Sequence, residues 1–142
     1  MSSVHRFLSL TSAERRRLVR AFFAVAGVRL GLSIVQFPRF QAVHEWVKAA
    51  PRAKRGKVPT TGQLAHDVRV VSHYVPRATC LTQALAGQLL LERHGYPTVV
   101  HVGVTKEEGK AATFQAHAWL ESDGKVVIGE TEVPYVPLTT LS

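Results

Sequence analysis

The 142-residue chain is long enough for one compact domain and too short for two, and its composition, 46% apolar and 20% charged, excludes wholesale disorder. The single cysteine, Cys80, excludes an internal disulfide and any metal site built from several cysteines. Residues 1–57 carry a net charge of +10 and residues 58–142 a net −2, so the basic part is expected to meet an anionic partner.

The N-terminal part is predicted to be helical. Thr11 and Glu14 form a capping box, in which each side chain satisfies a free backbone N–H group, so a long helix is expected to begin at Thr11. It should run to about Val35 and end before Pro38, because the residue preceding a proline disfavours helical backbone angles. A second helix is expected over residues 40–50, where apolar residues recur at helical spacing.

The long helix is apolar on more than one side, with five arginines spread along it. Such a helix is typically buried or covered by a partner; a basic helix on a membrane surface, over residues 15–37, is the alternative. Arg20 and Arg29 interrupt the most apolar window, which excludes a transmembrane span, and no signal-peptide cleavage site follows. We therefore expect a cytoplasmic protein with at most peripheral membrane contact.

Residues Pro51–Pro59 have the composition of a solvated basic linker. No interleaved aromatic residues or recognised nucleic-acid-binding motif accompany this basic run, so nucleic acid is not expected as a partner. The linker divides the chain into a basic N-terminal helical segment, residues 1–57, and a core, residues 58–142.

The core is predicted to contain two helices followed by strands. Helices are expected over residues 61–74 and 79–94, the second closed by Gly95. Beyond Pro97 the pattern changes to β-branched residues, and strands with a hairpin turn at Asp123-Gly124 are expected over residues 98–105, 112–121 and 125–129. Helices followed by an antiparallel meander define an α+β fold.

Cys80 is the candidate nucleophile and His117 the candidate base. Cys80 lies in the first turn of its predicted helix, where free N–H groups and the positive end of the helix dipole favour a thiolate. His117 lies in a predicted strand. A lone cysteine or a lone histidine is more often a core residue, but a cysteine at a helix start combined with a histidine on a following sheet is how cysteine acyl-transfer sites are assembled.

Glu130 is the candidate acid that orients the imidazole of His117. If Asp123 and Gly124 are the two central residues of the hairpin turn, the antiparallel register places His117 directly opposite Glu130. Their Cβ atoms would then lie ~4.5–5.5 Å apart. Asp123 itself would lie at the hairpin tip, far from the helix start. A bulge would shift this register by one residue and turn Glu130 to the other face.

No metal or nucleotide cofactor is predicted. Among the remaining histidines, His66 and His73 lie seven residues apart, without the ligand spacing of a metal site. The sequence also contains no glycine-rich loop of the kind that cradles phosphates.

Five segments, taken in order, resemble the transglutaminase-like core of lasso-peptide maturation proteases: Cys80-Leu-Thr-Gln-Ala-Leu-Ala, Arg93-His-Gly-Tyr-Pro, Val102-Gly-Val, Phe114-Gln-Ala-His-Ala-Trp-Leu-Glu and Asp123-Gly-Lys-Val-Val. The resemblance covers about residues 76–130. It implies a papain-like cysteine protease fold, in which N-terminal helices pack on an antiparallel sheet, with Cys80 as nucleophile and His117 as base. The third member of this family's site is often Asp, where the candidate here is Glu130.

The resemblance also implies a reaction and its partners. The enzyme would cleave a ribosomally made precursor peptide between leader and core, and the core would pass to an ATP-dependent lasso cyclase. Residues 1–57 lack the strands of the family's leader-binding domain, so a separate leader-recognition protein is expected. Two alternatives stay open: transglutaminase-type acyl transfer to an amine, and a non-catalytic peptide-binding module.

Overall fold

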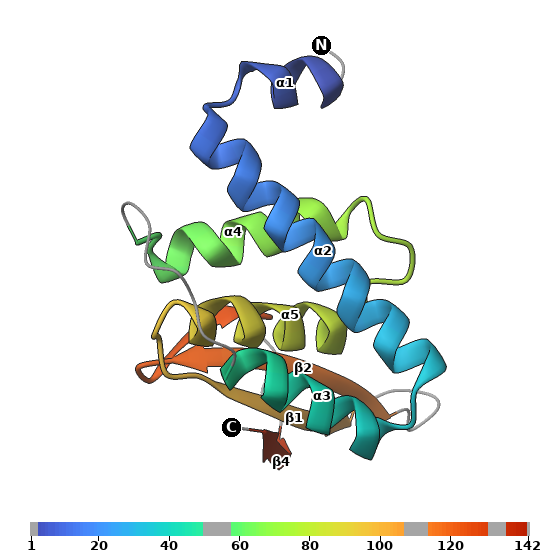
Figure 1. Ribbon diagram of the computed structural model, residues 1–142. Coiled ribbons are helices and arrows are strands. Elements are labelled where there is room, and N and C mark those ends of the chain that lie inside the picture. The colour runs from blue at the N-terminus through green and yellow to red at the C-terminus, as the bar shows by residue number, and fades with distance from the viewer. Residues whose placement is uncertain (1–2, 50–57, 107–113, 131–135, 142) are drawn as a thin grey trace.

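The computed structural model of the protein describes residues 3–49, 58–106, 114–130 and 136–141 (Figure 1). Within these ranges the chain forms helices and then strands, in the order α1 (Ser3–Ser9), α2 (Ser12–Ile34), α3 (Phe37–Ala49), α4 (Thr61–Ser72), α5 (Cys80–Arg93), β1 (Val99–Lys106), β2 (Phe114–Ser122), β3 (Lys125–Ile128) and β4 (Val136–Leu141). The predicted α+β fold with an antiparallel sheet is therefore confirmed. The predicted linker and the domain boundary at residue 57 fall largely outside the described residues.

Threonine caps set the starts of three helices. Thr11 accepts a hydrogen bond from the Glu14 N–H, and Glu14 reaches back to Thr11, so the predicted capping box is confirmed. Hydrogen bonds from the Thr11 N–H and hydroxyl also lower the pKa of the Glu14 carboxyl. Thr60 forms the same reciprocal capping box with Gln63 at the start of α4, and the Thr79 side chain accepts from the Thr82 N–H at the start of α5. These caps explain why the predicted helix starts are accurate.

The second helix begins earlier than the sequence predicts. Pro38 was expected to separate two helices, but α3 starts at Phe37 and includes this proline in its first turn. A proline is tolerated there because the first-turn N–H groups have no intrahelical acceptor. The sequence prediction also omits α1, a helix of seven residues, and strand β4.

Helix α5 lies at the centre of the fold. It contacts β1, β2 and β3 on one side and α2, α3 and α4 on the others, as Figure 1 shows. Its buried residues share one hydrophobic core with α2 and α4, and α2 contributes Ala21, Ala24, Val25 and Val28 to that core. The opposite side of α2 exposes Val19, Phe23, Leu30 and Ile34. The long helix is thus buried along one side only.

A buried polar chain joins α3, α5 and β4. The Nε2–H of His44 donates to the Gln88 side-chain oxygen at 3.1 Å, and the Gln88 amide nitrogen donates to the Leu141 carbonyl at 3.0 Å. Burial lowers the pKa of His44, with the Gln88 hydrogen bond acting in the opposite direction. Because the Gln88 oxygen only accepts, this chain fixes His44 Nε2 as a donor.

The sheet has the strand order β3-β2-β1-β4, with neighbouring strands antiparallel. The hairpin between β2 and β3 turns at Asp123 and Gly124, which have φ angles of +52° and +75°. Positive φ at both central residues is the geometry of a type I′ turn, as the Asp-Gly pair predicts.

The predicted register holds next to this turn and fails beyond it. Ser122 pairs with Lys125 and Glu121 with Val126, as expected, but Leu120 pairs with Ile128. The extra residue, Val127, forms a bulge, which shifts every later position by one. The predicted direct opposition of His117 and Glu130 is therefore wrong.

The close packing of α5 on the sheet yields a first prediction. A methyl group at Gly87 would collide with the Ile128 side chain and lie 2.9 Å from Leu120, whereas one at Gly27 of α2 would meet nothing within 4 Å. We expect Gly87→Ala to lower the free energy of unfolding by about 1–3 kcal/mol through overpacking. Gly27→Ala should raise it by about 0.5–1 kcal/mol, because alanine is the better helix former.

Urea unfolding of both variants measures this difference. Both substitutions remove a glycine from a helix interior, so the helix-propensity gain is shared and the contrast reports packing alone. Equal stabilisation of the two variants would show that α5 does not approach the sheet so closely.

Candidate functional site

Cys80 is the first residue of α5, at the end that the Thr79 cap defines. The Thr79 hydroxyl accepts from the Thr82 N–H at 3.3 Å, and the Thr79 carbonyl accepts from Gln83. Helix geometry leaves the N–H groups of Cys80 and Leu81 without an intrahelical acceptor, and such groups attract negative charge. The Cys80 side chain is half-buried against the core, so the thiol is neither fully sequestered nor fully exposed.

The loop before Cys80 contains a strained residue. Arg77 has a φ of +58°, in the left-handed region. This conformation costs a non-glycine residue about 1–2 kcal/mol. Such strained residues cluster at functional sites, because the surrounding structure must hold them in place. The feature therefore supports, from backbone geometry alone, the assignment of the α5 start as a site.

His117 lies in β2 with its ring oriented by two contacts. Its Nε2 lies 2.7 Å from the Gly129 carbonyl oxygen, and its ring stacks on Trp119 with centroids 6.1 Å apart. A carbonyl oxygen only accepts, so Nε2 carries the proton of the neutral ring and Nδ1 is the acceptor nitrogen. The tautomer that a general base requires is therefore set by the backbone.

Gly129 is a residue of the candidate site that sequence reasoning missed. Its φ is +84°, and a Cβ there would lie 2.7 Å from the Ala118 carbonyl oxygen. Only glycine allows this close approach, which brings the Gly129 carbonyl to His117. The signal available in the sequence was the glycine itself, at the end of a predicted strand.

A row of aromatic rings continues from His117 along one face of the sheet. Trp119 stacks on His117 on one side and on His101 of β1 on the other, with the His101 and Trp119 centroids 5.3 Å apart. His101 Nε2 also lies 3.1 Å from a Glu121 carboxylate oxygen, although neither buried ring nitrogen makes a hydrogen bond within the described part of the chain. The row holds the Trp119 ring, and through it one side of His117.

The structure places Cys80 and His117 at the same level along the sheet. Gly87 of α5 packs against Leu120, and Glu92 near the end of α5 accepts from Thr98 just before β1, so α5 and β2 run in the same direction. From the Gly87–Leu120 contact, Cys80 is seven residues back along the helix and His117 three residues back along the strand. Both distances are about 10 Å, so the two residues lie at the same level.

The two side chains reach this level from different faces. Ala118 and Leu120 of β2 are buried beside α5, and alternation along the strand gives His117 and Trp119 the opposite face. His117 also lies beyond the pairing of β2 with β3, which covers residues 120–122 only. The Gly129 backbone lies against β2 at this level, close to the Ala118 carbonyl and Trp119, and the pairing of His117 with Cys80 is a proposal taken up below.

Glu130 lies beside Arg69 of α4. Their side-chain atoms are 3.8 Å apart, and 70% of the Glu130 side chain is exposed. Arg69 also donates to the Val127 carbonyl at 2.6 Å, which ties α4 to β3. Glu130 directly follows the residue whose carbonyl holds His117, but the described acceptor at Nε2 is the Gly129 carbonyl. The catalytic role of Glu130 stays a prediction.

Within the described residues, no three His, Cys, Asp or Glu side chains lie together as a metal ion would require. None of the described helices combines the length and the apolar character needed to cross a membrane.

Comparison with protein families matches residues 12–141 to the Transglutaminase-like superfamily. Neither the comparison with curated proteins nor that with solved structures found a match. The matched range begins at the α2 cap and ends in β4, so it includes the long N-terminal helix together with the core, Cys80 and His117. This chain therefore belongs to the Transglutaminase-like superfamily.

Proposed function

We propose that this protein is a cysteine protease that removes the leader from a ribosomally made lasso precursor peptide. Cys80 acts as nucleophile, His117 as general base and Glu130 as the acidic third member. Membership of a superfamily that commonly has cysteine peptidase or acyltransferase activity supports the reaction class. The resemblance in the motifs around Cys80 and His117 supports the substrate class.

One observation carries the catalytic part of the proposal. The Gly129 carbonyl fixes the proton of the His117 ring on Nε2, which makes Nδ1 the nitrogen that accepts a proton from a thiol. His117 lies on β2 at the level of the α5 start, and the proposal pairs its ring with the Cys80 thiol there.

The mechanism follows from these residue types. Nδ1 of His117 takes the thiol proton, and the Cys80 sulfur attacks the scissile carbonyl carbon. The N–H groups of Cys80 and Leu81 face the developing oxyanion. His117 then donates its proton to the leaving amine, which releases one fragment and leaves a thioester. Water, deprotonated by His117, hydrolyses the thioester and restores the Cys80 thiol.

Glu130 is proposed as the acid because it follows Gly129 directly. Its exposed ion pair with Arg69 is of a kind that contributes little to stability, so breaking it during turnover costs little. A carboxylate brought towards the ring would stabilise the imidazolium that forms when His117 takes the thiol proton.

The proposed partners are a separate leader-recognition protein, which holds the precursor, and an ATP-dependent lasso cyclase, which receives the core. The proposed compartment is the cytoplasm, where a reducing environment keeps the thiol of a lone cysteine available.

The superfamily match also favours a second reaction, acyl transfer to an amine. It uses the same thioester, and only the acceptor differs. Adding a primary amine to the assay separates the two, because transfer gives an amide product and hydrolysis a free acid.

The central prediction concerns Cys80. We expect Cys80→Ala and Cys80→Ser to abolish cleavage of a short precursor peptide encoded beside this gene, as followed by mass spectrometry with the neighbouring leader-recognition protein present. Both variants should keep the circular-dichroism spectrum and thermal midpoint nearly unchanged, because Cys80 is half-buried at a helix end. Full activity of the alanine variant, or no such precursor beside the gene, would contradict the proposal.

A second prediction concerns the partner. We expect efficient cleavage only when the leader-recognition protein is present, and we expect the rate to fall as salt rises from low to physiological concentration. The basic N-terminal part supplies the charge that salt would screen. A rate that is independent of salt would show that the basic residues do not contribute to binding. Full activity without the leader-recognition protein would show that this partner is not required.

A third prediction compares two acids near the hairpin. Glu130→Gln is expected to lower the rate of cleavage at least ~10-fold by weakening control of the imidazolium, whereas Asp123→Asn at the turn should have little effect. Both changes remove one negative charge from the same hairpin. If Glu130→Gln leaves the rate unchanged, Glu130 is not the acid that acts on His117.

A further inference from the structure

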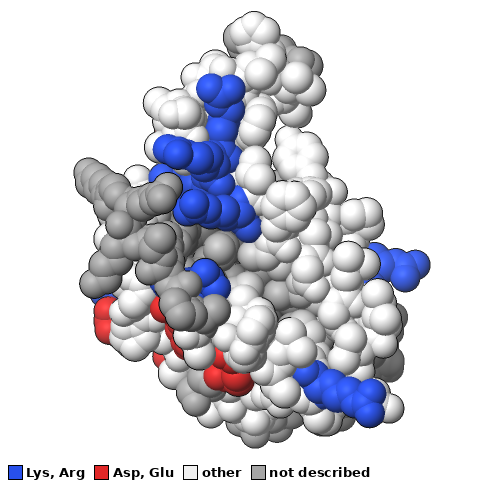
Figure 2. Space-filling view, viewed as in Figure 1, with Lys and Arg blue, Asp and Glu red and all other residues white. Residues whose placement is uncertain are grey.

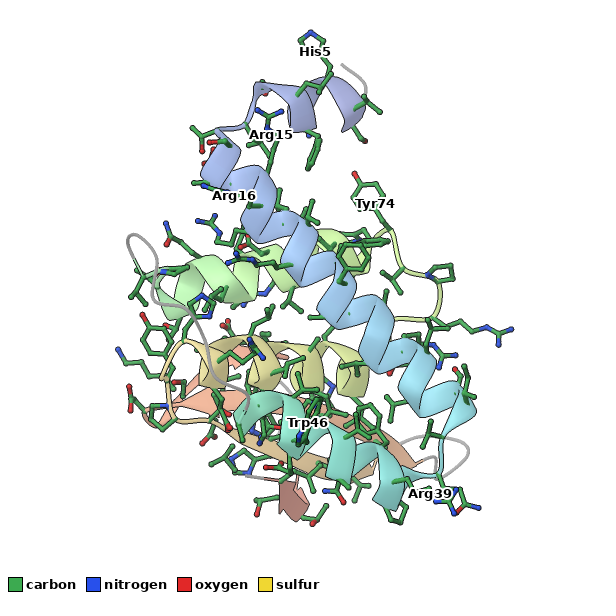
Figure 3. The ribbon with its side chains drawn as sticks, viewed as in Figure 1. His5, Arg15, Arg16, Arg39, Trp46 and Tyr74 are labelled. Carbon is green, nitrogen blue, oxygen red and sulfur yellow. The ribbon has the colours of Figure 1, made fainter. Side chains whose placement is uncertain are left out.

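The junction of α1 and α2 forms a cleft lined mainly by apolar side chains. It has a volume of about 600 Å³ and lies between α1, the first turns of α2 and the end of α4. Its apolar walls are Val4, Phe7, Leu10, Leu18, Val70 and Tyr74. Tyr74 is 61% exposed and Val4 66%, and Figure 3 shows the Tyr74 ring projecting from the end of α4 towards α1. A recess of this volume is within the range of pockets that bind ligands.

The acidic groups of the cleft are already engaged. At its floor, Arg17 donates to the side chain of Asp67, which is 1% exposed. Burial raises the pKa of Asp67, and the Arg17 hydrogen bond acts in the opposite direction. Glu14 is held by Thr11 in the capping box. Neither carboxylate is therefore available to neutralise a further cation at this surface.

A second hollow lies on the other side of Phe7, and its exposed wall is apolar because the arginines that line it contribute their aliphatic stems. It has a volume of about 460 Å³ and is lined by Phe7, Ser12, Val19 and three arginines, Arg15, Arg16 and Arg20. Figure 2 shows Lys and Arg side chains gathered over the N-terminal half of α2. Among the residues that the structure describes, these three arginines make no ion pair. Phe7 thus separates an apolar cleft from a cluster of unpaired positive charge.

We propose that this surface, the elbow surface, binds an acidic peptide segment of a partner protein that also carries large apolar side chains. Apolar side chains of the segment enter the cleft beside Phe7 and Tyr74, and its carboxylates meet Arg15 and Arg16. The elbow surface lies at the start of α2 and at the C-terminal end of α4, and none of its lining residues takes part in the proposed chemistry of Cys80.

Two other occupants fit the elbow surface less well. A lipid bilayer is flat on this scale, so its surface cannot reach apolar side chains that line a recess, although the arginines would attract anionic lipid. A second copy of this chain would bring the same arginines to the contact, where like charges repel. A peptide segment supplies both the negative charge and side chains that fill a cleft.

Binding to a defined probe tests the proposal. The probe is a short fluorescein-labelled peptide designed as an amphipathic helix of Leu, Phe and Glu, and fluorescence anisotropy with the full chain measures its affinity. We expect it to bind, with an affinity that falls as salt rises. The same peptide with Lys in place of Glu should not bind. Failure of the acidic peptide to bind, or equal binding of the Lys peptide, overturns the proposal.

Matched variants locate the contact. Phe7→Ser and, on the opposite wall, Tyr74→Ser are each expected to weaken binding about 10-fold, whereas Trp46→Ser, an exposed aromatic on α3, should not. Arg15→Gln with Arg16→Gln should remove most of the salt dependence, and Arg39→Gln should not. Figure 3 shows Trp46 and Arg39 on α3, away from Arg15 and Arg16. Unchanged affinity in both wall variants would overturn the proposal.

Two controls separate this proposal from its alternatives. Cys80→Ala should bind the acidic peptide with the same affinity as the unmodified chain. The binding experiment therefore tests the elbow surface even if the cleavage assay fails. Phosphatidylglycerol vesicles form the lipid arm. Vesicles that compete with the peptide for the elbow surface, or bind in its place, would assign the surface to a membrane and overturn the peptide proposal.

Discussion

The approach of α5 to the sheet at Gly87 is the contact on which the rest of the molecule depends. No side chain fits between this residue and the Leu120 and Ile128 side chains. The helix therefore lies directly on the sheet, with α2 and α4 covering its other side. Because the level of α5 relative to β2 is fixed there, the level at which Cys80 meets the sheet is fixed as well. The helix start is thus positioned by packing two turns away.

Local signals explain which parts of the fold the sequence could predict. The Thr11 cap and the Asp123-Gly124 turn each act within four residues, and each appears in the structure as expected. The start of α3 was misplaced because a proline has two local meanings, a helix end or a helix first turn. Strand β4 and the bulge at Val127 depend on pairing between distant segments, which spacing alone does not reveal.

The candidate site also contains residues that local signals predict and contacts that depend on distant segments. Cys80 and His117 could be singled out because each residue type has a known chemistry and each lies on a predictable element. The partner of the His117 ring could not, because it is a main-chain carbonyl brought in by a bulge and a positive φ. The elbow surface escaped prediction for a related reason. The sequence shows an apolar, arginine-rich helix, but only the packing of α1 and α4 shows which of its sides is covered.

The His117 ring is held by a backbone carbonyl, and a backbone group responds to mutation differently from a side chain. Replacing a side chain cannot delete that acceptor, so an alanine scan would register the hydrogen bond only at His117 and at Gly129, where a Cβ displaces the chain. Its loss requires a change in chain path, such as a substitution that Gly129 cannot accommodate, or a backbone ester that alters the carbonyl itself. The residue at position 129 is therefore limited by conformation, because its φ of +84° and the nearby Ala118 carbonyl leave no room for a Cβ.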